Sequence, residues 1–93
     1  MAKGFPMTNL FLTARVSEVM KQDNEFRELV NASIERHFAG DWGEVSENSK
    51  RENDIALSDG SRLLSAYSKN ERRIWLITEA DRSATTVLFP EEY

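Results

Sequence analysis

The sequence predicts a single α+β domain in which a three- to four-stranded antiparallel sheet packs on one main helix, in the order β-α-α-β-β-β. Three observations predict this class. An amphipathic helical period runs over residues 25–38, several strand-like segments follow Gly60, and the chain has 93 residues. A chain of that length supports one hydrophobic core but not two, so residues 1–93 are expected to form one domain.

The first expected element is a strand or extended arm over Asn9–Val16. This stretch is rich in apolar and β-branched residues, and it follows Gly4 and Pro6. Residues 17–22 either extend the strand or form a short helical turn.

The main helix is predicted over Glu25–Phe38. Its apolar positions recur at helical spacing, and they are Phe26, Leu29, Val30, Ile34, His37 and Phe38. Asp23 or Asn24 can cap the first turn, and Gly40 is a suitable residue to end the helix.

A second, surface helix is predicted after Ser46, ending before the residues Ser58-Asp59-Gly60. Its apolar face is narrow. The residues expected to seat it are Val45, Ile55, Ala56 and Leu57.

Beyond Gly60 the pattern changes to strands. Residues 62–68 and 73–78 flank a turn at residues 69–71, which predicts an antiparallel hairpin. Residues 85–89 form a third strand, which Pro90 ends because proline cannot donate to a ladder.

The composition excludes several kinds of site. The chain has no cysteine, so it forms no disulfide, no thiolate zinc site, no iron–sulfur cluster and no thiol nucleophile. We expect no cofactor. The apolar stretches are far shorter than the roughly 20 residues that span a bilayer, and no leader-like segment is evident, which predicts a cytoplasmic protein without membrane contact.

The net charge is −4, from 12 basic and 16 acidic residues. Such a mean field disfavours a nucleic-acid backbone, so we expect no direct nucleic-acid binding; the arrangement that would allow it uses Arg72, Arg73 and Arg82. The acidic excess is concentrated in residues 35–59, with seven acidic and three basic side chains. A basic protein is therefore the expected partner.

The junction His37-Phe38-Ala39-Gly40-Asp41-Trp42-Gly43 is the first candidate site. His37 is the only histidine, Asp41 and Glu44 lie close by in sequence, and two glycines would let a ligand approach the backbone. The favoured interpretation is structural: His37 bonds the last helix carbonyls and Trp42 closes the edge of the core. These ligands are too few for a diagnostic metal site.

A second candidate is the polar turn containing Glu79, Asp81 and Arg82. Paired carboxylates beside an arginine can bind a polar ligand, although a solvated turn is the commoner outcome. A small enzyme or ligand-binding module would require His37, Asp41 and Glu79 to converge in one pocket.

The acidic run from Glu44 to Asp59 is the candidate partner-binding segment. Clustered carboxylates can present a phosphate-like field to a basic groove, whereas the usual explanation is a solvated helix face. The residues predicted to contact a partner are Asp41, Trp42, Glu44, Glu47, Glu52 and Asp54. A free sheet edge with exposed aromatic residues also allows a homodimer.

The strings RHFAGDWG, LLSAY and IWLITEADRSATTVLFPEEY resemble a family of small, uncharacterised proteins carried on bacterial plasmids, prophages and integrative elements. The resemblance covers residues 26–93. It implies a mobile-element setting, where small acidic proteins often inhibit host defence, anti-CRISPR proteins among them. The resulting hypothesis is that the chain is a non-catalytic acidic binding protein that inhibits a host nucleoprotein defence complex.

Overall fold

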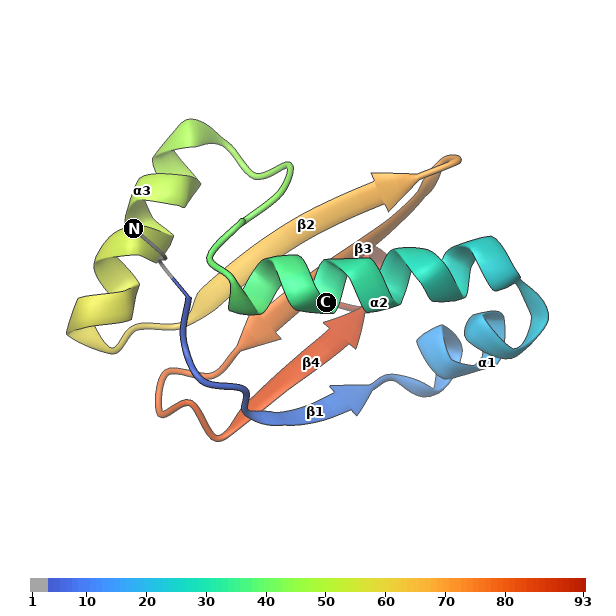
Figure 1. The fold of residues 1–93 in the computed structure, drawn as a ribbon, viewed down its shortest axis with the longest axis horizontal. Coiled ribbons are helices and arrows are strands. Elements are labelled where there is room, and N and C mark those ends of the chain that lie inside the picture. Colours follow the sequence, from blue (N-terminus) through green and yellow to red (C-terminus); the bar gives the residue numbers. More distant parts are fainter. Residues whose placement is uncertain (1–3) are drawn as a thin grey trace.

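The computed structural model describes residues 4–93, which form a four-stranded sheet with helices against one face and at one end (Figure 1). The elements in chain order are β1 (Asn9–Leu12), α1 (Ala14–Gln22), α2 (Asn24–Phe38), α3 (Glu47–Asp59), β2 (Leu63–Lys69), β3 (Arg72–Thr78), β4 (Ala84–Leu88) and the 3₁₀ turn η1 (Pro90–Glu92). The predicted α+β class is confirmed. The strand order in the sheet is β1-β4-β3-β2.

The sequence predicts an antiparallel sheet, but the observed sheet is mixed. β2, β3 and β4 form an antiparallel meander, whereas β1 lies parallel to β4, with Asn9 opposite Ala84 and Leu12 opposite Val87. The chain passes through three helices and two strands between β1 and β4. No tight hairpin therefore imposes an antiparallel direction on this pair.

The N-terminal strand is shorter than predicted because a helix begins directly after Thr13. The Thr13 hydroxyl accepts a hydrogen bond from the Val16 amide at 3.2 Å and so caps α1. The same hydroxyl donates to Glu92 at 2.9 Å, which ties the start of α1 to the C-terminal turn. Residues 14–22 are therefore helical, and the expectation of a strand to Val16 is wrong.

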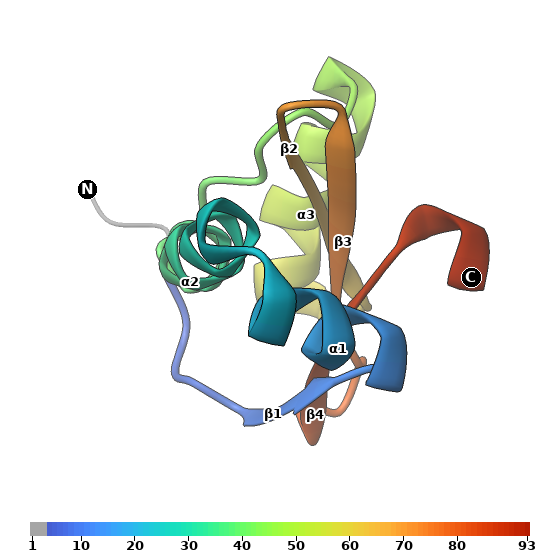
Figure 2. The ribbon, with the colours of Figure 1, turned by 90° about the vertical axis from the view of Figure 1, so that its right-hand side faces the viewer.

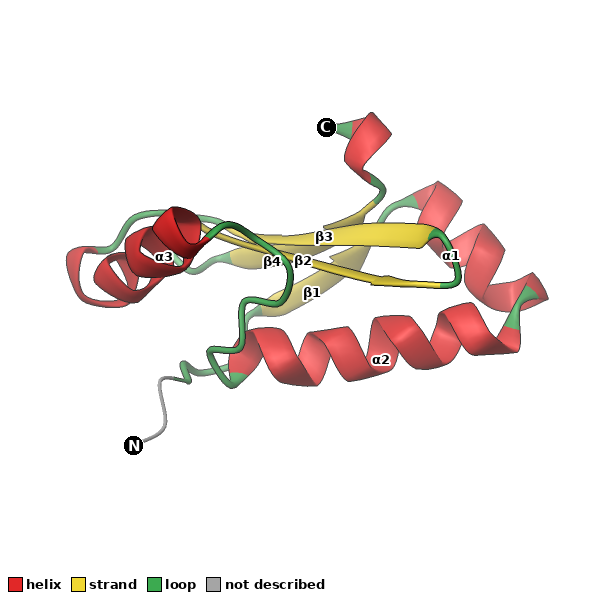
Figure 3. Ribbon diagram, turned by 90° about the horizontal axis from the view of Figure 1, so that it is seen from above, coloured by secondary structure: helices red, strands yellow, loops and turns green. Residues whose placement is uncertain are grey.

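The main helix lies where the sequence predicts it. Asp23 caps α2 by accepting from the Phe26 amide at 3.1 Å, and Gly40 has the left-handed φ of 82° that ends the helix. α2 runs along one face of the sheet (Figure 3). The main core, to which α1 also contributes, consists of Val16, Phe26, Val30, Tyr67, Ile74, Leu76, Val87 and Phe89.

The hairpin between β2 and β3 also lies where it is predicted. Asn70 and Glu71 both have positive φ, 51° and 66°, as a two-residue type I′ turn requires. After β4, Pro90 begins η1, which lies on the sheet face opposite α2 (Figure 2). There the ring of Tyr93 is 5.5 Å from that of Trp75.

α3 packs beside β2 through a narrow face, as predicted for a surface helix. Asn53 and Ala56 are buried, but Ile55 is 61% exposed, so the expectation that Ile55 helps to seat the helix is wrong. A second cluster joins Trp42, Ala56 and Leu63. Within residues 4–93, no helix is long and apolar enough to cross a membrane.

Candidate functional site

The junction between α2 and α3 runs along the outer edge of β2. Gly43 forms an isolated parallel bridge with Ala66. The Glu44 amide donates to the Ala66 carbonyl at 2.7 Å, and the Ala66 amide donates to the Trp42 carbonyl at 3.3 Å. The junction thus supplies hydrogen-bond partners for an edge strand.

This close approach requires glycine at position 43. Gly43 has a φ of 74°, and a Cβ placed there would lie 2.1 Å from the Ala66 carbonyl oxygen. It would also lie 2.8 Å from ring atoms of Tyr67. The second glycine of the GDWG string therefore serves contact with β2 rather than with a ligand.

Two side chains extend the protection of the β2 edge. Asn53 of α3 donates to the Leu64 carbonyl at 2.8 Å and accepts from the Leu64 amide at 3.2 Å. The Glu44 carboxylate accepts from the Ser68 amide at 2.9 Å and from its hydroxyl. The backbone of β2 consequently has partners outside the sheet at residues 64, 66 and 68.

Trp42 lies in the second core cluster and is only 2% exposed. Its indole nitrogen donates to the Asp54 carboxylate at 2.9 Å. Two residues predicted to contact a partner thus contact each other, and Trp42 presents no free ring to the solvent. The alternative interpretation, in which Trp42 closes the edge of the core, describes its position.

His37, in the last turn of α2, is fully buried against β2 and β3. One ring nitrogen lies 2.6 Å from the Ser65 hydroxyl and the other 2.8 Å from the Thr78 hydroxyl. The Thr78 hydroxyl in turn lies 2.7 Å from that of Thr85. Burial lowers the pKa of the His37 imidazole to about 4, so the ring is neutral near pH 7.

The three residues of the proposed enzyme site do not converge. Both nitrogens of His37 bond hydroxyl groups, whereas Asp41 forms an ion pair with Arg36 at 2.7 Å. The hydrogen bond from Arg36 holds the pKa of the Asp41 carboxyl below its usual value. Glu79 is exposed. This geometry provides no general base beside an open pocket, and His37 bonds strand hydroxyls instead of the predicted helix carbonyls.

The polar turn after β3 is also internally bonded. Asp81 accepts from the Ser83 amide at 3.0 Å, and hydrogen bonds from Ser83 lower the pKa of the Asp81 carboxyl. Arg82, with a φ of 61°, donates to the carbonyls of Ala56, Ser61, Glu79 and Ala80. The guanidinium therefore joins this turn to the end of α3 and does not pair with the Glu79 carboxylate.

The other two arginines considered for nucleic-acid contact have acidic partners. Arg72 lies 3.4 Å from Asp23, and Arg73 lies 3.8 Å from Glu44. Each of these three arginines is thus engaged within the chain.

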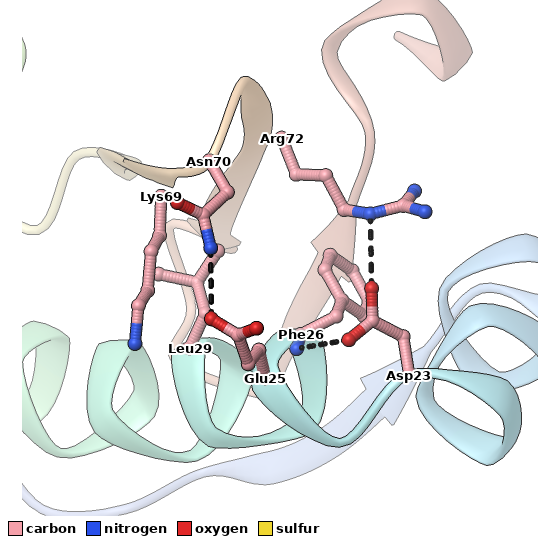
Figure 4. Close-up of a pocket in the computed structure, with 7 residues that line it drawn as sticks. All are labelled: Asp23, Glu25, Phe26, Leu29, Lys69, Asn70 and Arg72. Atoms are coloured by element: carbon pink, nitrogen blue, oxygen red, sulfur yellow. Dashed lines mark hydrogen bonds and ion pairs between the residues drawn. The ribbon is translucent and has the colours of Figure 1, made fainter.

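A polar pocket of about 300 Å³ lies between the start of α2 and the β2–β3 turn (Figure 4). Asn70 donates to Glu25 at 2.8 Å, and Arg72 pairs with Asp23 across the pocket. These four side chains form two pairs within the chain, and Lys69 is the remaining charged side chain that lines the pocket. The pocket was not predicted, because its two walls lie 40 or more positions apart in the sequence.

The outer surface of α3 has a different character. Glu52, Ile55 and Asp59 lie three and four positions apart and share one side of the helix. A pocket of about 290 Å³ beside them is lined also by Ser61 and Arg62. An exposed isoleucine between two carboxylates is the clearest apolar and acidic surface on this helix.

Of the remaining predicted contact residues, Glu47 is exposed and pairs with Lys50 at 3.2 Å. Glu44 is engaged by Ser68, as described above. Ile55 was not predicted as a contact residue, because its apolar character indicated burial. The spacing of Glu52, Ile55 and Asp59 on one helical face was the available signal.

Within residues 4–93, no group of three or more histidine or carboxylate side chains could hold a metal ion. Comparisons with protein-family models, with curated proteins and with solved structures find no match to this chain.

Proposed function

We propose that this chain is a non-catalytic binding protein that contacts a basic protein through the outer face of α3. The observation that carries the proposal is Ile55, which is 61% exposed and flanked by the carboxylates of Glu52 and Asp59. An apolar side chain gives contact area, and the surrounding carboxylates favour a positively charged partner.

The rigid attachment of α3 supports this role. Asn53 bonds the β2 backbone on the inner side of the helix, and Arg82 bonds its last turn. The outer face is thereby held in place before binding, which reduces the ordering cost of association.

The resemblance to proteins of plasmids, prophages and integrative elements supports a more specific form of the proposal. The partner would be the basic groove of a host defence nucleoprotein complex, and the protein would act as an inhibitor of the anti-CRISPR type. Carboxylates on α3 would then compete with nucleic-acid phosphates for that groove.

The test is affinity capture from a bacterial host lysate with immobilised protein, followed by mass spectrometry. We expect wild type to retain a basic protein that Glu52→Lys and Ile55→Lys lose. Glu28→Lys is the matched control for Glu52→Lys, because Glu28 is an exposed acid on α2 and the two substitutions change the net charge equally. Equal capture by all four proteins would contradict the proposed surface.

The inhibitor form needs a separate measurement. Once the captured protein is purified, added DNA or RNA should displace wild type from it, since both would occupy the same groove. A ternary complex with nucleic acid would contradict competition while leaving binding through α3 intact.

A further inference from the structure

The two edges of the sheet differ in how they are protected. Along β2, Leu64, Ala66 and Ser68 all form hydrogen bonds with groups outside the sheet. β1 forms the other edge, and among residues 4–93 it has a strand neighbour on one side only (Figure 1). An open edge with free backbone groups is a template for pairing with another strand.

The direction of the backbone identifies the groups at this open edge. The Thr13 amide donates to the Val87 carbonyl of β4 at 3.1 Å. Because successive strand residues direct their amide and carbonyl groups to opposite sides, Phe11 also faces β4. The amide and carbonyl groups of Leu10 and Leu12 therefore point away from the molecule.

The side chains of β1 are apolar and exposed. Leu10, Phe11 and Leu12 are 38%, 54% and 37% exposed, respectively. The register places Leu10 and Leu12 on the sheet face that α2 covers and Phe11 on the opposite face. β1 thus offers apolar contact on both sides of the strand.

This edge lacks the usual charged protection. Residues 5–14 contain no charged side chain, and the strand itself contains no proline. Edge strands in natural proteins commonly carry lysine, an inward charge or a bulge that prevents pairing. Here only the short length of β1 limits association.

We propose that β1 pairs with β1 of a second copy of this chain, in antiparallel orientation about a two-fold axis at Phe11. Leu10 of each copy then lies opposite Leu12 of the other, and both pairs exchange backbone hydrogen bonds. The two Phe11 residues form the central pair without such bonds, where side chains approach most closely. The result is a continuous eight-stranded sheet.

A second copy fits this edge better than a foreign peptide. The edge has no charge with which to select a charged peptide, whereas an uncharged apolar strand is complementary to itself. Each chain has a net charge of −4, but the acidic helix α3 packs beside β2 at the far edge. The proposed interface therefore keeps the two acidic helices apart.

Sedimentation equilibrium over a wide range of concentration tests the interface. We expect wild type to pass from monomer to dimer, and added salt not to weaken the dimer. Phe11→Lys should weaken it at least about tenfold, since like charges directly opposite each other are destabilising. Ile55→Lys is the control, because Ile55 on α3 is similarly exposed, at 61% against 54% for Phe11, and it should leave the dimer unchanged.

Single cysteines introduced into this cysteine-free chain test the register of the interface. This test does not depend on whether the Phe11→Lys variant folds. Phe11→Cys should form a disulfide-linked dimer under mild oxidation, because opposed residues lie within disulfide range. Asn9→Cys should not, because the two copies of Asn9 would be about 13 Å apart along the strands. A monomeric wild type, a dimer unaffected by Phe11→Lys, or equal cross-linking at both positions would overturn the proposal.

Discussion

The chemistry of His37 suggests a site that titrates near neutral pH, but its position in the structure gives it a structural role. It is the only histidine, but both of its ring nitrogens bond hydroxyls in the core, and burial lowers its pKa to about 4. A neutral imidazole that bridges Ser65 and Thr78 satisfies polar groups of two strands. Its function is to join α2 to the sheet.

This position makes the stability of the protein depend on pH. Between about pH 6.5 and pH 4 the unfolded chain binds a proton at His37 that the folded chain does not. The free energy of unfolding should therefore fall as the pH falls through this window, by at most about 3 kcal/mol from this group. Urea unfolding of wild type at several pH values measures the loss.

His37→Gln isolates this effect from that of the carboxylates. Glutamine keeps a donor and an acceptor but takes up no proton, so the variant should be less stable than wild type at pH 7. The difference in the free energy of unfolding between wild type and the variant should then become smaller towards pH 4. Parallel stability curves for the two proteins would show that His37 is not the titrating group.

Trp42 and Ile55 show the limit of prediction for single residues. The sequence presents Trp42 as a surface anchor or a core plug and Ile55 as an inner residue, yet Trp42 is 2% and Ile55 61% exposed. Which apolar side chain of a polar segment is buried depends on where α3 packs against β2. That packing is a tertiary fact that local pattern does not contain.

At the scale of elements, local signals predict α2 and the β2–β3 hairpin well. Asp23, the helical period and Gly40 define α2, and the turn at Asn70 and Glu71 defines the hairpin. For residues 17–22 the helical alternative is the one found, but the start of α1 was not predicted because it depends on the Thr13 cap within a β-like run. The parallel pairing of β1 was missed because its partner lies more than 70 residues away.

The junction between α2 and α3 is an edge-protecting element, and Gly43 is its most constrained residue. Gly43→Ala combines an unfavourable positive φ with a Cβ only 2.1 Å from the Ala66 carbonyl oxygen. We expect a loss of about 3 kcal/mol or more in the free energy of unfolding. Faster hydrogen exchange of the Ala66 amide, which bonds Trp42, should accompany it.

Gly60→Ala provides the matched control for that substitution. Gly60 has a similar φ of 81°, but a Cβ there meets nothing within 4 Å. Its cost should be that of the left-handed conformation alone, about 1 kcal/mol. If both alanine variants lost the same free energy of unfolding, the junction would be able to shift at little cost. Its stability would then not depend on close contact with β2.

At the scale of the whole molecule, the two proposed surfaces lie at opposite ends of the sheet. The order β1-β4-β3-β2 places the open edge at one end, and α3 packs beside β2 at the other. In the proposed dimer the two β2 strands would be about 34 Å apart across eight strands. The acidic helices would then lie at the two ends of one continuous sheet.

This arrangement predicts that dimerisation strengthens binding to a surface that carries many copies of the basic partner. Phe11→Lys should lower retention on a densely coated sensor about tenfold or more, because two α3 faces no longer bind together. On a sparsely coated sensor it should match wild type, whereas Ile55→Lys should weaken binding on both. An equal effect of Phe11→Lys at both densities would show that β1 contacts the partner directly, which would contradict the separation of the two surfaces.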